Sequence, residues 1–599
     1  MNRKTQWMAL FAFALAAMIS GCSSSKPPIT VAVTAPSSVE VSDPVSISAA
    51  VTNDKADAGV TWTCSPSPCG TFSSATSASG ASVTYLAPNT AGTVTLTATS
   101  VTNTLITGTA SITVSPIAAT TSISGNYVFL VNGYNSNGPF GAAGAFTADG
   151  SGNISAGEED YADTTGIDAD DTFTGTYTIG SDGRGTMTVQ LTNGVTSGPS
   201  TIGIAGQETF AFAVTSAKHG FIEGFDGTTI AAGSLDAQTA PPADTTDIKG
   251  TYSFTFAGAD VVALTLQPGG GVLTADGSGN FASVTVDYND GGSVYTDTLT
   301  SDTYTAADTL GRGTMSLDGD PMAFYYVGPE VVRFVDLESM LYIENGTLYG
   351  QGTLSPSNAS LTGAYVFGEA GIDTSFGPMG VAGEFTADGA GNLTAGVADI
   401  NDGSGTIQTA VPLTLTTAYA ISGSGGGRGT LTVPPLGSLG DVSSFNIYLV
   451  DPALNIFDPN NASGGGGALF LDVDVPIEGV GELLPQGAPS SSTFQGNYAF
   501  GMEYVDDFSG TGQFLSDGSA TLTGTADGEN AGAPEPAVTI TGAWALDSTN
   551  PGRLTDTLTL GFTVPDTFTV TQYVASSTVQ FGVDTTAADS GGIVIIEHQ

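Results

Sequence analysis

Apolar residues alternate with Thr, Ser and other polar residues over much of this chain. This period of two is typical of strands with one buried and one solvated face. Examples lie at 30–34, 45–51, 59–64, 82–85, 93–98 and 110–114, and later at 187–191. Glycine and the pairs Asp-Gly and Gly-Asn separate the runs, and such residues accept the positive φ of tight turns. The pattern predicts an all-β protein.

Residues 29–116 hold about seven short alternating strands, which is the size of a β-sandwich. Trp62 lies on a central strand, where a core aromatic residue is expected. This segment resembles the bacterial immunoglobulin (Ig)-like domains of surface proteins. It departs from the antibody pattern because Cys64 and Cys69 are too close in sequence to join two sheets. In an oxidising compartment we expect these two cysteines to form a local disulfide.

The rest of the chain is a fourfold internal repeat. Each copy has a Gly-x-Tyr-x-Phe strand, an Asp-Gly turn, an aromatic residue followed by Arg, and an aromatic residue followed by an acid. The first mark occurs at Gly125, Gly250, Gly363 and Gly496. The last mark is assigned to Phe221…Glu223, Phe334…Asp336, Phe457-Asp458 and Phe581…Asp584.

The repeat and the Pro/Ser-rich joints divide the chain into domains. We expect repeat domains at 123–238, 248–354, 361–486 and 494–599, called copies 1 to 4 below, each with about eight antiparallel strands. An up-and-down barrel is favoured because closure removes exposed sheet edges. An open sandwich and an eight-bladed propeller, with two blades per copy, are the alternatives.

The N-terminus carries a leader. Arg3 and Lys4 precede an apolar run that is too short to span a bilayer, as in secretory signals. The run ends Ile19-Ser20-Gly21-Cys22, which resembles the lipobox of bacterial lipoprotein precursors. The resemblance implies a signal peptide at 1–21, lipidation of Cys22 and a short tether at 22–28. It also implies a partner membrane: Ser23, where an inner-membrane retention signal would have Asp, favours anchoring at the outer membrane or cell surface.

The chain is strongly acidic, with 58 acidic and 11 basic residues and a net charge of −47. Nucleic-acid binding is therefore disfavoured, since it needs basic patches. The 40% hydrophobic content is sufficient for packed cores, which argues against a disordered acidic chain.

The Asp-Gly-x-Gly-Asn turns raise the question of calcium. Asp149, Asp276 and Asp388 each begin a series of alternating oxygen ligands, with a further Asp (Asp160, Asp287 or Asp399) eleven residues on. An apolar residue stands where a calcium loop needs glycine. A hairpin turn is the preferred interpretation, with calcium as a weak alternative and no cofactor or metal expected.

The Gly-Arg turns place arginines at one repeat position. We expect Arg184, Arg312, Arg428 and Arg553 to pair with a carboxylate in their own copy. The alternative is that their planar guanidinium groups bind an anionic ligand.

Catalytic signals are few. His219 lies in an expected turn, His598 is the penultimate residue, and the common nucleophile, zinc and phosphate motifs are absent from the sequence. We therefore predict a non-enzymatic, lipid-anchored surface protein for adhesion, glycan or small-ligand binding, or structural display, in which the tandem copies act through avidity. An extracellular hydrolase of polysaccharide or peptide is the alternative.

Overall fold

The computed structural model describes residues 27–599, except 41–43, 68, 89–91, 116–121, 193–202, 240–243, 263–264, 339–341, 437–442, 462–464, 488–493, 504–507, 519, 531–532, 562–565, 577 and 587–590. The chain divides into two compact units, Met1–Ala118 and Ala119–Gln599. The signal peptide and Cys22 lie outside the described residues. In the described part, no helix is long and apolar enough to cross a membrane.

The first unit has two β-sheets that share one core. The sheets have the orders β1-β3-β7-β5 and β2-β9-β8-β4-β6. Trp62 from one sheet and Tyr85 from the other are both buried in this core, so the unit is a two-layered sandwich. The kinship with Ig-like domains stays a prediction. The strands of the first unit are β1 (Thr30–Thr34), β2 (Ser38–Glu40), β3 (Pro44–Thr52), β4 (Val60–Ser65), β5 (Thr71–Phe72), β6 (Thr76–Ser77), β7 (Ser82–Leu86), β8 (Gly92–Ser100) and β9 (Thr107–Ser115).

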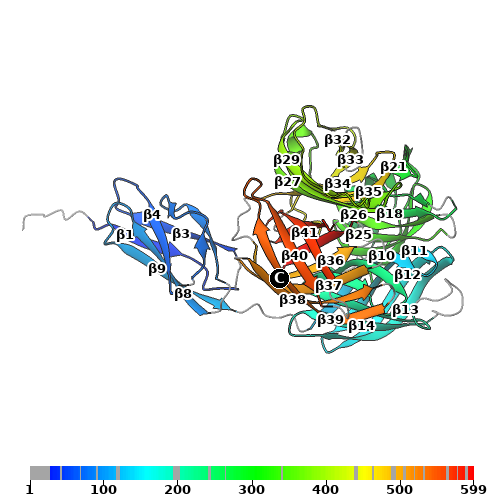
Figure 1. The fold of residues 1–599 in the computed structure, drawn as a ribbon, viewed down its shortest axis with the longest axis horizontal. Helices are drawn as coiled ribbons and strands as arrows, with labels where there is room; N and C mark the ends of the chain where they lie inside the picture. The colour runs from blue at the N-terminus through cyan, green and yellow to red at the C-terminus, as the bar shows by residue number, and fades with distance from the viewer. Residues whose placement is uncertain are drawn as a thin grey trace, which may run out of the picture. The chain divides into compact units, whose positions relative to one another are not determined.

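The second unit consists of the four copies, each an antiparallel meander rolled into a barrel, as predicted (Figure 1). Copies 1 and 4 are closed barrels of eight strands. In copies 2 and 3 the described strands form nine-stranded sheets in which the path stays open between β22 and β23 and between β30 and β31. In copy 2 the isolated bridge between Tyr304 and Met315 extends the edge at this gap.

The strands follow the same order in every copy. Copy 1 contains β10 (Ser124–Asn135), β11 (Gly138–Asp149), β12 (Asn153–Asp163), β13 (Gly166–Ile179), β14 (Arg184–Leu191), β15 (Gln207–Ser216), β16 (His219–Gly224) and β17 (Thr229–Ala237). Copy 2 contains β18 (Lys249–Asp260), β19 (Thr265–Leu266), β20 (Gly269–Asp276), β21 (Phe281–Asp290), β22 (Ser293–Leu299), β23 (Arg312–Leu317), β24 (Asp320–Gly328), β25 (Val331–Asp336) and β26 (Tyr342–Gly350).

Copies 3 and 4 repeat this order. Copy 3 contains β27 (Thr362–Asp373), β28 (Gly377–Asp388), β29 (Leu393–Asn401), β30 (Gln408–Pro412), β31 (Tyr419–Ile421), β32 (Arg428–Val433), β33 (Ser443–Leu449), β34 (Ala468–Asp472) and β35 (Ile477–Pro485). Copy 4 contains β36 (Gln495–Glu503), β37 (Phe508–Asp517), β38 (Thr521–Asn530), β39 (Ala533–Leu546), β40 (Arg553–Leu560), β41 (Asp566–Val574), β42 (Val579–Asp584) and β43 (Ile593–His598). Two short 3₁₀ turns, Thr245–Asp247 and Asn358–Ser360, precede copies 2 and 3.

Strand alternation sends one set of side chains into each barrel and the other set outward. In β14, Met187, Val189 and Leu191 are buried in the core of copy 1, and Thr188 and Gln190 between them are more exposed. The outward-facing apolar residues of all four copies meet in one further cluster, which includes Val128, Tyr325, Tyr448 and Phe581. The copies are therefore packed against one another as a single body.

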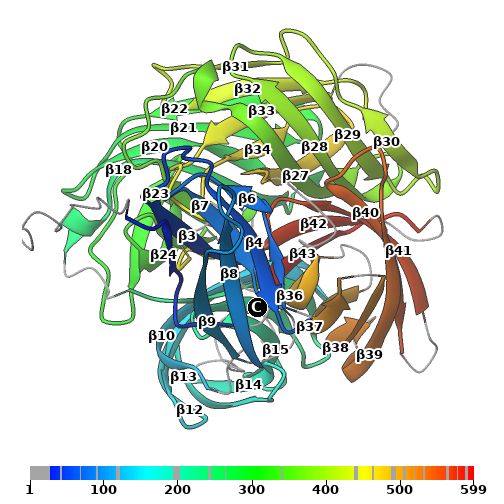
Figure 2. The ribbon, with the colours of Figure 1, turned by 90° about the vertical axis from the view of Figure 1, so that its left-hand side faces the viewer.

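The four copies form a closed ring. The first strands of each copy contact the last strands of the next, for example β11 with β25 and β28 with β42. The same contact joins copy 4 back to copy 1 through β37 and β15. Figure 2 shows copies 1 to 4 following one another around a centre, from cyan through green and yellow to red. This ring differs from a propeller because every copy keeps a barrel core of its own.

One predicted repeat mark was misplaced. Phe457 and Asp458 lie between β33 and β34 and not on a strand. The repeat-equivalent residue is Phe470, which pairs with Ile447 as Phe334 pairs with Phe324. The sequence comparison selected a neighbouring aromatic and acidic residue, whereas the strand register identifies Phe470 as the true equivalent.

Candidate functional site

The four repeat arginines join neighbouring copies, which corrects the expectation that each pairs within its own copy. Arg312 of copy 2 binds Asp160 of copy 1, with Nε–Oδ2 and Nη2–Oδ1 distances of 2.6 and 2.7 Å. The same two-pronged contact is made by Arg428 to Asp287 and by Arg553 to Asp399.

The acceptor carboxylates are the aspartates that lie eleven residues after each Asp-Gly turn. Asp160 is fully buried, and Tyr325 of copy 2 also donates a hydrogen bond to it, at 2.6 Å. Burial alone would lower the pKa of Arg312, but Asp160 and Tyr325 raise it above its ordinary value. These aspartates therefore accept hydrogen bonds from the next copy, a role that the comparison with calcium-binding loops did not predict.

The seam between copies 4 and 1 is a weaker version of the same joint. Arg184 of copy 1 reaches Asp527 of copy 4 through Nη1 alone, at 2.6 Å, while its Nε binds Asp182 of its own turn. Ala213 occupies the position that carries tyrosine in the other copies, because it pairs with Arg184 as Tyr325 pairs with Arg312. This seam lacks the tyrosine hydroxyl.

A second recurring joint, not predicted from the sequence, consists of glutamines that follow the last strand of each copy. Gln238 of copy 1 donates to the carbonyl oxygens of Leu310 and Tyr326 in copy 2, at 2.8 and 2.7 Å. Gly311 makes room for it, since a Cβ there would lie 2.1 Å from Gln238 Nε2. Equivalent bonds to the next copy are made by Gln351 to Gly426, Gln486 to Val574 and Gln599 to Val214.

The calcium candidates cap their own turns. Asp149 accepts hydrogen bonds from the backbone N–H groups of Ser151 and Asn153 and from the Asn153 side chain. Asp276 and Asp388 repeat this arrangement. The bonds satisfy the carboxylates locally, and no group of three or more metal-ligating side chains occurs among the described residues.

The predicted disulfide joins Cys64 to Cys69 in the first unit, with a Cα–Cα distance of 5.7 Å.

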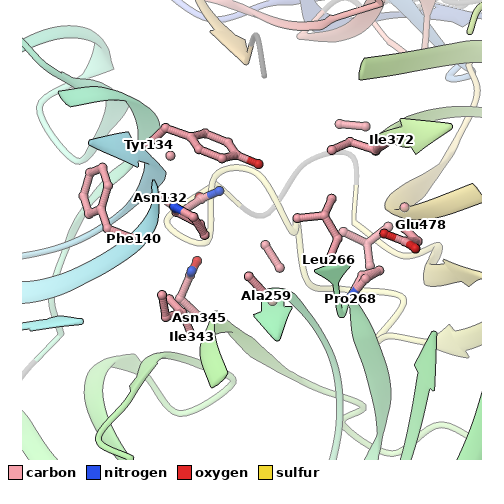
Figure 3. Close-up of a pocket in the computed structure, with 18 residues that line it drawn as sticks. Asn132, Tyr134, Phe140, Ala259, Leu266, Pro268, Ile343, Asn345, Ile372 and Glu478 are labelled. Carbon is pink, nitrogen blue, oxygen red and sulfur yellow. The ribbon is translucent and has the colours of Figure 1, made fainter. Parts of the chain in front are cut away.

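A cavity of about 150 Å³ opens where copies 1, 2 and 3 meet (Figure 3). Tyr134, Asn132 and Phe140 lie on one side of it, and Glu478 and Ile372 lie on the other. Between them are the apolar and amide side chains of copy 2: Ala259, Leu266, Pro268, Ile343 and Asn345.

An adjoining cavity of about 190 Å³ is lined by all four copies and shares Asn132 and Asn345 with the first. We call the two together the central cavity. One position of the last strand contributes a residue from each copy, as the strand registers show: Ser234, Thr347, Glu482 and Ile595.

His219 lies buried at this cavity, as the first residue of β16 and not in the expected turn. Its Nδ1 is 2.8 Å from Asp236 Oδ1 of copy 1, and its Nε2 is 3.2 Å from Glu597 Oε2 of copy 4. Asp236 in turn accepts a bond of 2.6 Å from Nη2 of Arg333 in copy 2. We call these four residues the central network.

The network keeps its charges despite burial. Burial alone would lower the pKa of His219, but Glu597 and Asp236 raise it well above its usual value. Burial opposes ionisation of Asp236, yet Arg333 and His219 hold the pKa of that carboxyl below its usual range. His219 is therefore held as an imidazolium, with a carboxylate beside each ring nitrogen.

The sequence concealed this network because its members are distant along the chain. One signal was available: at some repeat positions a single copy carries a charge where the others are apolar.

Comparisons with known proteins identify no family. No family model and no curated protein matches the chain. One similar solved structure is a protein of unknown function from the DUF3598 family of Nostoc punctiforme, with 12% identity, 40% of this chain and 94% of that chain covered, and a TM-score of 0.12.

Proposed function

We propose that this protein is a lipid-anchored surface protein that binds a small ligand in its central cavity without transforming it. The observation that carries the proposal is the convergence of all four copies on that cavity, which is lined by both polar and aromatic residues. Ligand sites in proteins are typically concave and mostly apolar, with a few placed polar groups. The anchor at Cys22 rests on the lipobox resemblance.

Ring closure changes the expected mode of binding. Avidity requires several separate and equivalent sites. Here the copies diverge at the positions they bring to the centre, where Ser234, Thr347, Glu482 and Ile595 stand at one repeat position. One composite site therefore fits the geometry better than four weak ones.

The histidine chemistry of a hydrolase does not fit the central network. A general base needs a free lone pair within reach of the proton it abstracts. His219 presents both ring nitrogens to carboxylates and is held protonated, so it is poorly suited to activate a nucleophile.

The test is a binding and turnover screen on the full chain. Small-molecule and glycan libraries are screened by thermal shift, and hits are incubated with the protein and analysed for products. Ala257, which lines both cavities, is replaced by Phe to obstruct them; Val294→Phe, at an exposed position, is the control. Binding that Ala257→Phe removes and Val294→Phe retains, without product, supports the proposal; turnover, or no ligand at all, refutes it.

A further inference from the structure

Arg333 departs from the repeat at an outward-facing position of β25, the next-to-last strand of copy 2. Its equivalents are found from the register, since each pairs with the residue that faces the joint arginine: Phe221, Leu469 and Phe581. Three copies thus place an apolar side chain between barrels where copy 2 places a guanidinium group. The difference is specific to the central cavity, which Arg333 lines.

Two of the three guanidinium nitrogens have partners. Nη2 donates to Asp236 at 2.6 Å, and Nη1 donates to the hydroxyls of Thr347 and Tyr349 at 2.7 and 3.3 Å. Within the described part of the chain, Nε has no hydrogen-bond partner although Arg333 is only 5% exposed. Leaving a buried donor of a charged group unpaired is costly, so a bound acceptor would be stabilised there.

The charges around Arg333 disfavour an anion as that acceptor. The cavity and its network contain the carboxyl groups of Asp236, Glu478, Glu482 and Glu597 against the cations Arg333 and His219. A negatively charged ligand would be repelled by those carboxylates. An uncharged oxygen can accept from Nε without this penalty.

The shape and the remaining lining fit a sugar. The cavity that Arg333 lines, of about 190 Å³, is large enough to accept a six-membered ring. Asn132 and Asn345 line this cavity and the adjoining one and offer amide groups that both donate and accept hydrogen bonds, and Tyr134 offers an aromatic ring in the adjoining one (Figure 3). Such a set suits a molecule with hydroxyl edges and apolar faces.

We propose that the central cavity binds the end of an uncharged carbohydrate chain, and that Arg333 determines this specificity by donating from Nε to a hydroxyl or ring oxygen. This inference rests on the proposed function, whose ligand class it names.

The test uses the full chain and isothermal titration calorimetry. The probes are tetrasaccharides of glucose, galactose and mannose, with tetragalacturonate as the charged comparison. Arg333→Lys keeps a cation beside Asp236 but removes the Nε donor. Phe581→Leu is the matched control, because it installs the residue of copy 3 at the equivalent position of copy 4.

We expect at least one neutral tetrasaccharide to bind, and Arg333→Lys to weaken it about tenfold, the effect of losing a hydrogen bond to a charged group. Phe581→Leu should leave the affinity unchanged, and thermal unfolding of each variant separates binding from stability. Equal binding by Arg333→Lys, or preference for tetragalacturonate, overturns the inference. If other small ligands bind and neutral sugars do not, the inference is overturned and the proposed function stands. If no class of ligand binds, both the inference and the proposed function are refuted.

Discussion

Removing the guanidinium group of Arg312 should destabilise the contact between copies 1 and 2 by about 3–5 kcal/mol, because it leaves the fully buried Asp160 without its cation. The substitution is Arg312→Met, which keeps most of the aliphatic length. Among the described residues, the hydroxyl of Tyr325 and the backbone N–H of Asp170 would still donate to the carboxylate. An exposed pair would lose less than about 1 kcal/mol, so the two cases are distinguishable.

The matched control is Arg184→Met at the seam between copies 4 and 1. Arg184 makes one short contact with Asp527, and its Nε pairs with the half-exposed Asp182 of its own turn. Its replacement should therefore reduce the free energy of unfolding less than replacement of Arg312 does. Unfolding of the full chain in urea, followed by fluorescence and circular dichroism, gives the free energies. The double variant Arg312→Met with Asp160→Ala should recover much of the loss, since replacing both members of a buried pair is often nearly neutral. Equal small effects of the two single variants would refute the reasoning.

Three further predictions concern pH, the chain terminus and the anchor. Burial raises the pKa values of Glu208 and Glu369 to about 8, so these groups bind protons more tightly in the folded than in the unfolded chain. The stability of the fold should therefore decrease as the pH rises from about 4.5 to 8. A maximum of thermal stability at neutral pH, measured at constant ionic strength, would contradict this. Gln599→Ala removes the bond of 2.9 Å to the Val214 carbonyl and should raise hydrogen exchange in β15, with unchanged exchange counting against a role in closure. Cys22→Ala should abolish acylation, and mass spectrometry that still finds a lipid-modified N-terminus would exclude Cys22 as the anchor.

The barrels could be predicted from sequence because each strand reports its own environment. Alternation such as Met187, Val189 and Leu191 with threonine and glutamine identifies a strand with one buried face. The Asp149 turn is equally local, since all its bonds span four residues or fewer. Such signals determine a copy but not how copies are joined.

The joints could not be predicted, because the repeat makes the partner ambiguous. Arg312 and Asp160 were both visible as repeat positions, but an arginine facing its own copy and one facing the preceding copy have the same sequence pattern. The central network was less accessible still, since Arg333 and Asp236 are 97 residues apart and meet only in the assembled ring. What could have identified Arg333 is its mismatch with the apolar residues of the other copies.

The seam between copies 4 and 1 should be where the ring first opens. The other three contacts join copies that are linked along the chain, so separation is limited by a short segment. Copies 4 and 1 have no such link, and their joint has one arginine contact and Ala213 in place of a tyrosine. In the described part of the chain, packing and side-chain bonds hold this seam.

Buried acids make this opening sensitive to pH. Glu223 of copy 1 and Glu529 of copy 4 are fully buried at the seam. Burial raises the pKa of Glu529 to about 8, with Asp226 adding to the effect, and burial and Asp527 raise that of Glu223 well above its usual value. Asp527, which contributes to the shift of Glu223, is itself paired with Arg184. Raising the pH from 6 to 9 should ionise Glu529 and so place a negative charge in the seam.

Hydrogen exchange measured by mass spectrometry at several pH values, after correction for the intrinsic rate, would follow this opening. Protection in β15–β17 and β36–β38 should fall at lower pH than protection at the contact between β20 and β33, where Arg428, Asp287 and Tyr448 form the complete joint. Glu529→Gln should shift the loss at the seam to higher pH and leave the contact between copies 2 and 3 unchanged. Simultaneous loss at both contacts would mean that the ring opens as one cooperative unit, and the missing tyrosine and buried acids would then not determine where it begins.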